Sequence, residues 1–182
     1  MNPLQQQFNL VHDCIRACVY CEHIHKQNTT SGAWLSLKGM CYSDAINTWN
    51  QLFGVWSQDT HWKKFVSILE TDNYKGFDFF TKEKILDSLK ISESQWSTFH
   101  QSMIDVRNTR IAHLNFSKKL DSLPNLEWVL LSACFYREWL VQTWKQGNGN
   151  SKSVNTEEQN TNLLVKKFYE QIRSAYDGIQ EH

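Results

Sequence analysis

The 182-residue chain has little proline and little glycine, with only 2 Pro and 7 Gly. So few helix-breaking residues, together with apolar positions that recur every three or four residues, favour helices over a strand-rich fold. The chain also lacks a charge excess, because 19 Lys and Arg residues balance 19 Asp and Glu residues. This balance argues against a generally basic nucleic-acid-binding surface, although a locally basic site is compatible with it.

Long apolar runs are missing as well, since no stretch approaches the roughly 18 apolar residues of a transmembrane helix. The first residues, MNPLQQQ, have neither the basic region nor the apolar region of a secretory signal. Hydrophobic residues make up 41% of the chain, which suffices for a globular core. We therefore expect a globular protein without a membrane partner, located in the cytoplasm.

Cysteine is present in an odd number, 5, and Cys14, Cys18 and Cys21 are crowded into one predicted helix. Such close helical neighbours are poor candidates for a structural disulfide framework. Together with His25 they suggest zinc, but Cys14 and His25 would lie roughly 16 Å apart along the helix axis. Zinc ligands must all lie about 2.0–2.3 Å from one ion. We therefore expect small buried thiols here, with no metal site and no cofactor.

The periodicity predicts an all-α fold: a bundle of four longer helices with short accessory helices and a C-terminal helix. Pro124 is expected in the first turn of the fourth longer helix, where proline is tolerated. The longer helices are expected at residues 4–26, 33–53, 92–113 and 123–144. The shorter helices are expected at 61–69 and 81–90, with an aromatic loop at 72–80.

The domain organisation follows from a change in composition near residue 147. Residues 147–153 are rich in Gly, Asn and Ser, which is typical of a linker. We expect one helical domain at 1–146, a polar linker at 147–160 and an amphipathic helix at 161–182.

The most informative segment is DVRNTRIAHL, at residues 105–114. It follows an apolar stripe with steps of three and four residues, formed by Trp96, Phe99, Met103 and Val106. The same spacing of three and four residues continues to Arg110 and His113, and Arg107 lies on the adjoining face. Burying an unpaired arginine is costly, so this end of the face should open onto a groove, a partner or an anion. A helix-capping histidine and salt-bridged surface arginines are the simpler interpretation of the same residues.

The residues from Arg107 to His113, RNTRIAH, resemble the signature of the HEPN superfamily of helical toxins and phage-defence ribonucleases. That signature is an arginine, a polar residue and a histidine after four to six intervening positions. Here Asn108 is the polar residue, and five positions separate Arg107 from His113. The sequence RNTRIAHL resembles that of HEPN proteins linked to abortive infection. The resemblance to the fold covers roughly residues 4–146.

The resemblance implies a metal-independent RNA endonuclease that acts as a homodimer, with two copies of the motif forming one composite site. His113 would be the general acid or base, Arg107 would hold the phosphate, and Asn108 would orient Arg107 or the substrate. Arg110 would bind phosphate or pair with an acid across the dimer. On a helix, Arg107 and His113 lie about 120° and roughly 9 Å apart, so a symmetry mate is needed to bring such groups together.

One departure from the family concerns its antitoxin partners. Some HEPN toxins have a tyrosine two positions after the motif histidine, which a partner nucleotidyltransferase adenylylates, whereas this chain has Asn115. A possible antitoxin partner protein would therefore need another mode of neutralisation.

Two alternative functions stay open from the sequence. One is a catalytically inactive HEPN-like interaction module, and the other is a nucleotide-binding regulatory domain. Of the 8 tryptophans, most are expected in the core or a dimer interface, and Trp56 and Trp62 are the candidates for RNA contact.

Overall fold

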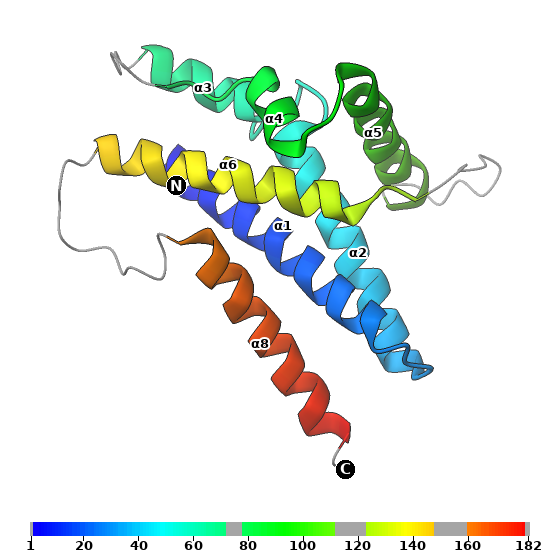
Figure 1. Cartoon of the computed structure of the whole chain (residues 1–182). Helices are drawn as coiled ribbons and strands as arrows, with labels where there is room; N and C mark the ends of the chain where they lie inside the picture. Colours follow the sequence, from blue (N-terminus) through cyan, green and yellow to red (C-terminus); the bar gives the residue numbers. More distant parts are fainter. Residues whose placement is uncertain (1, 72–77, 112–122, 148–159, 181–182) are drawn as a thin grey trace.

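The computed structural model describes residues 2–71, 78–111, 123–147 and 160–180 (Figure 1). Throughout these ranges the regular secondary structure is helical, which confirms the all-α prediction. The elements are α1 (Pro3–Lys26), α2 (Gly32–Phe53), α3 (Trp62–Thr71), α4 (Lys82–Leu89), α5 (Glu93–Val106), η1 (Arg107–Ile111), α6 (Leu126–Gly147) and α8 (Thr161–Gln180). No helix within the described ranges is both long and apolar enough to cross a bilayer.

Helix α1 is the centre of the arrangement, because α2, α6 and α8 all pack against it. Figure 1 shows α1 and α2 as a hairpin, with α3, α4 and α5 on one side of the α1, α2 and α6 group and α8 on the other. The N-terminus of α1 is capped by Asn2, whose side chain accepts a hydrogen bond from the Leu4 N–H, and Pro3 occupies the first turn.

An aromatic cluster fills the core where α2, α4, α5 and α6 meet. Trp49 of α2 is fully buried, and its ring lies 5.2 Å from that of Phe99. The Trp49 indole also donates a hydrogen bond of 2.9 Å to the Ser132 hydroxyl on α6. A buried indole is stable only when its N–H has such a partner. This contact fixes α2 against α6 and positions the helices that carry the candidate site.

Helix α8 uses one face to cover α1. Phe168, Ile172 and Tyr176 are buried on that face, at spacings of four residues. Phe168 belongs to the main core, whereas Ile172 and Tyr176 form a smaller cluster with Ile24 and Trp34. The amphipathic pattern predicted for 161–182 is therefore observed through Tyr176.

Most predicted helix boundaries agree with the structure, but the prediction for Pro124 is wrong. Pro124 precedes α6 instead of occupying its first turn, because Asn125 provides the start: its side chain accepts the Glu127 N–H at 2.8 Å. Of the predicted aromatic loop, residues 72–77 lie outside the described residues, as do 148–159 of the predicted linker.

Candidate functional site

Helix α5 carries the apolar stripe that precedes the candidate motif. The four predicted stripe residues are all buried: Trp96, Phe99, Met103 and Val106. The helix begins with a capping box, in which Ser92 accepts the Gln95 N–H and the Gln95 side chain accepts the Ser92 N–H. Both features confirm the sequence-based prediction for this helix up to Val106.

The predicted long helix is observed as far as Ile111, but it is α-helical only to Val106 and π-helical at Arg107–Ile111, while residues 112 and 113 lie outside the described residues. Two side chains bond to the backbone at this transition. The Met103 carbonyl accepts the Asn50 amide at 3.1 Å as well as the Arg107 N–H, and the Thr109 hydroxyl donates to the Asp105 carbonyl at 2.5 Å. Side chains that enter the backbone ladder are a recognised cause of local helix distortion, and π-helical turns are frequent at functional sites.

Asn50 holds this end of α5 against α2. It is buried, and its amide nitrogen also donates to the Ile46 carbonyl at 2.8 Å. The polar amide is therefore satisfied within the core. The Arg107 end of the helix is therefore held by a contact with the neighbouring helix α2.

Arg107 and Asn108 form the part of the predicted motif that the structure brings together. Arg107 is half-buried and Asn108 is exposed. A guanidinium nitrogen of Arg107, Nη1, donates to Oδ1 of Asn108 at 3.0 Å. The amide thereby orients one edge of the guanidinium, while the remaining N–H donors of the fork keep their capacity for an anion.

The remaining motif residues are described only in part. Thr109, which the motif interpretation did not use, is buried, and Ile111 packs against the core. Arg110 belongs to η1, but its side chain lies outside the described part of the structure, as do His113 and Asn115. The relation of Arg107 to His113 therefore stays a prediction.

A second candidate site lies toward the N-terminal end of the same helix. It is a pocket of about 380 Å³ between α5, α3, α4 and the loop that follows α2. Its polar and aromatic lining residues include Trp56, His61, Lys63, Lys82, Ser97 and His100. We call it the histidine pocket.

The two histidines of this pocket are held by the backbone. His61 is buried, and its Nδ1 accepts the Lys63 N–H at 3.2 Å. Burial, helped by the nearby positive charge of Lys63, lowers the pKa of His61 to about 4. Nε2 of His100 donates to the Phe53 and Gly54 carbonyls at 2.8 and 3.2 Å. Sequence reasoning missed this pair, because His61 and His100 become neighbours only through the tertiary fold.

The two tryptophans that were predicted as candidates for RNA contact behave differently. Trp62 is buried, with 6% of its surface accessible, whereas Trp56 is 54% exposed. The eight tryptophans all lie in the described ranges, and Trp56 is the exposed one among them. The structure therefore leaves Trp56 as the indole with a free surface.

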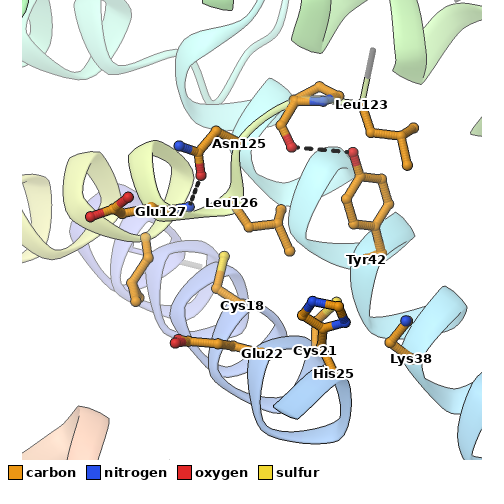
Figure 2. Close-up of a pocket in the computed structure, with 12 residues that line it drawn as sticks. Cys18, Cys21, Glu22, His25, Lys38, Tyr42, Leu123, Asn125, Leu126 and Glu127 are labelled. Carbon is orange, nitrogen blue, oxygen red and sulfur yellow. Dashed lines mark hydrogen bonds between the residues drawn. The ribbon is translucent and has the colours of Figure 1, made fainter. Parts of the chain in front are cut away.

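A larger pocket of about 720 Å³ lies between α1, α2 and the start of α6 (Figure 2). We call it the thiol pocket, because Cys18 and Cys21 line it beside His25 and Tyr42. Burial raises the pKa of Cys21 to about 11, and the Tyr42 hydroxyl donates to the Pro124 carbonyl at 3.5 Å. Within the described residues, no group of three or more His, Cys, Asp or Glu side chains could hold a metal ion.

No family model, curated protein or solved structure matches this chain.

One buried polar cluster was also missed by sequence reasoning. Arg137 of α6 is fully buried; its Nε donates to His12 Nε2 at 3.0 Å and its Nη1 to the Thr161 hydroxyl at 2.9 Å. Burial lowers the pKa of His12 to about 4, and the positive charges of Arg137 and Arg16 add to this effect. A neutral His12 can accept from the guanidinium, so the cluster joins α1, α6 and α8 and has a structural explanation.

Proposed function

We propose that the chain is a HEPN-type endoribonuclease that acts as a homodimer in toxin or phage-defence (abortive infection) systems. The proposal rests on the resemblance of RNTRIAH to the HEPN signature, in an all-helical chain of fitting size. The observation that carries it is the Arg107–Asn108 hydrogen bond, at the start of a π-helical turn that ends a buried apolar seam. An arginine oriented in this way suits recognition of a phosphate.

In the proposed reaction, His113 acts near neutral pH because the ordinary pKa of histidine is about 6.5. One imidazole removes the proton from a ribose 2′-hydroxyl. The 2′-oxygen then bonds to the adjacent phosphorus, and the bond from phosphorus to the 5′-oxygen breaks. The 5′-oxygen takes up a proton from an imidazolium, which leaves a 2′,3′-cyclic phosphate and a 5′-hydroxyl.

The arginines would act on the charge of the phosphate. Arg107 would stabilise the negative charge that develops on the phosphate oxygens, and Asn108 would hold the guanidinium in position. Arg110 would bind a neighbouring phosphate or pair with an acid of the other subunit. We further propose cytoplasmic residence for this RNA-directed activity and, if an antitoxin exists, neutralisation that does not use a tyrosine at position 115.

The first experiment compares RNA cleavage by the wild type with cleavage by Arg107→Ala and His113→Ala, in buffer containing EDTA. We expect each variant to lose at least about 100-fold in rate, which is the usual cost of removing a transition-state donor or a general base. The surface variant Arg173→Ala, in exposed α8, is the charge-matched control and should cleave normally. Unchanged cleavage by both motif variants would overturn the proposal.

The composite site is tested by mixing the two inactive variants. If Arg107 of one subunit works with His113 of the other, a mixture of Arg107→Ala and His113→Ala should recover part of the activity that neither has alone. A dimer that never cleaves RNA, and whose expression leaves growth unaffected, would instead indicate the interaction module. Dimerisation is measured in the same preparations by light scattering.

A further inference from the structure

The histidine pocket is the place outside the motif where several kinds of recognition chemistry meet. It receives residues from the loop after α2, from α3 and α4, and from the solvent-facing side of α5. Gly54 allows the chain to pass close to Asn50 at the end of α2, because a Cβ at position 54 would lie 2.5 Å from the Asn50 carbonyl oxygen. The loop therefore turns tightly beneath the pocket and carries Trp56 at its rim.

Trp56 offers an aromatic surface that is exposed and yet oriented. Its ring makes an edge contact with the buried His61 ring, at a centroid distance of 5.5 Å and an angle of 64°. Because 54% of the residue is accessible, much of the indole remains open to a ligand. Exposed aromatic rings of this kind are the stacking platforms of proteins that bind single-stranded nucleic acids.

The pocket also offers a positive charge. Lys82 is paired with Glu93 at 2.6 Å, so its charge is largely compensated. Lys63 differs, because its ammonium lies 5.4 Å from the centroid of the Trp62 ring and makes no ion pair within the described part of the chain. Hydrogen bonds with its own backbone N–H and with Thr81 are the main reasons for the lowered carboxyl pKa of Glu83, and Lys63 forms no ion pair with it. Lys63 is thus the cation that the pocket presents to an anion.

Hydrogen-bonding groups complete the lining. The two carbonyls bonded to His100 can only accept, so Nε2 of His100 carries the hydrogen that it donates to them. Ser97 and Gln101 are exposed one turn apart on α5 and line the same pocket. An aromatic face, a cation and neutral donors and acceptors together match a nucleotide.

We infer that the histidine pocket binds one nucleotide of a single-stranded RNA, with the base against Trp56 and a phosphate at Lys63. Ser97, Gln101 and Asn108 are all exposed, and the α-helical stretch from Gln101 to Val106 covers roughly 8 Å of the axis before the π-helical turn that carries Asn108. A strand held at Arg107 and Asn108 can therefore continue along α5 to the pocket. The identity of the strand rests on the proposed function, but the pocket is tested by binding alone.

The test uses fluorescence anisotropy of a labelled 2′-O-methyl octa-adenylate, whose blocked 2′-oxygen cannot attack phosphorus. Trp56→Ala should weaken binding by about 10-fold, and Trp56→Phe, which keeps a stacking ring, by no more than about 3-fold. Lys63→Gln should weaken binding and lower the salt slope by about 1, whereas Lys167→Gln on exposed α8 should change neither. The thermal midpoint of each variant verifies that the protein is folded.

A parallel titration with AMP distinguishes a strand from a free nucleotide. We expect the octamer to bind tightly and AMP weakly, with the same dependence on Trp56. Tight AMP binding without binding of the octamer would overturn the assignment to RNA. Equal octamer affinity of the wild type, Trp56→Ala and Lys63→Gln would overturn the pocket itself.

The cleavage assay separates this inference from the proposed function. Cleavage that depends on His113, with no effect of Trp56→Ala on octamer binding, removes the pocket and leaves the nuclease. Octamer binding that depends on Trp56, with no cleavage by the wild type, removes the nuclease and supports the pocket.

Discussion

The thiol pocket and the histidine pocket differ in the chemistry of the groups that line them. The thiol pocket is the larger of the two, but its thiols and its phenol are uncharged. In the thiol pocket, of about 720 Å³, a hydrogen bond with Cys14 and burial raise the pKa of Cys18, and burial raises the pKa of Cys21 and of Tyr42, so all three groups are protonated and uncharged. The histidine pocket, of about 380 Å³, holds a neutral imidazole at His61 and an exposed indole at Trp56. Each pocket has an ammonium, Lys63 in the histidine pocket and Lys38 in the thiol pocket. Volume alone is thus a poor guide to ligand binding here.

The lining side chains of the two pockets are also held in different ways. In the thiol pocket, Cys18 and Cys21 are small buried residues of α1, and the rest of the lining mixes leucines and a proline with polar and charged side chains such as His25 and Lys38. In the histidine pocket, both imidazoles form hydrogen bonds with backbone groups, and this leaves their rings fixed at the wall of an open cavity. The second arrangement is the one that gives a ligand specific contacts.

The largest expected effect concerns the reactivity of the thiols. The pKa of Cys21, about 11, makes its thiolate at pH 8 roughly 100-fold rarer than in an unfolded chain, and burial blocks access as well. Native protein should therefore react with Ellman's reagent more than about 100-fold more slowly than protein in urea, which should release all 5 equivalents. One full equivalent released from native protein within the mixing time, and absent from Cys21→Ala, would show that the thiol pocket holds an activated cysteine.

The next effect is a loss of stability at the base of the histidine pocket. In Gly54→Ala the new methyl group would meet the Asn50 carbonyl oxygen, so we expect a destabilisation of about 1–3 kcal/mol. Gly39→Ala is the matched control, since nothing lies within 4 Å of its new methyl group on α2. That variant should gain up to about 1 kcal/mol from helix propensity. Urea unfolding measures both free energies, and equal values for the two variants would contradict the close approach at Gly54.

The third effect is a dependence of stability on pH. Folding lowers the pKa of His61 from 6.5 to about 4, so between these values the unfolded chain binds more protons than the folded chain. The free energy of unfolding should therefore fall as pH drops from 6.5 toward 4, and stay level above this range as far as His61 is concerned. His12 acts in the same direction in the same window.

His61→Asn isolates the contribution of the histidine pocket, because the asparagine oxygen can still accept the Lys63 N–H. We expect its unfolding free energy to fall by about 1–2 kcal/mol less than that of the wild type between pH 7 and pH 4.5. Urea unfolding at both pH values provides the measurement. Parallel pH profiles for the two proteins would mean that His61 is not held neutral by folding.

The features that sequence reasoning could predict are those that local order determines. The helical period of Trp96, Phe99, Met103 and Val106 and the cap at Ser92 depend on neighbouring residues, and both are observed. At the π-helical turn, by contrast, Asn50 reaches the Met103 carbonyl from another helix. No pattern within residues 92–113 contains that information.

The same physical reason explains which side-chain contacts could be predicted from the sequence and which could not. Arg107 and Asn108 are adjacent in the chain, so their side chains can meet without help from the rest of the fold. The pairing of His61 with His100, and that of His12 with Arg137, requires the packing of helices that are distant in sequence. Those pairs became visible only in the three-dimensional structure.

The smallest expected effect discriminates directly between the two pockets. Glu93→Gln would release Lys82 at the rim of the histidine pocket, whereas Glu127→Gln removes an equal charge at the thiol pocket. Stability should change little, because exposed ion pairs contribute only about 0.2–1 kcal/mol. The freed ammonium should tighten binding of the labelled octamer by about 3-fold at low salt for Glu93→Gln, and far less for Glu127→Gln. Equal gains would indicate an effect of net charge alone, and a larger gain for Glu127→Gln would place the strand at the thiol pocket.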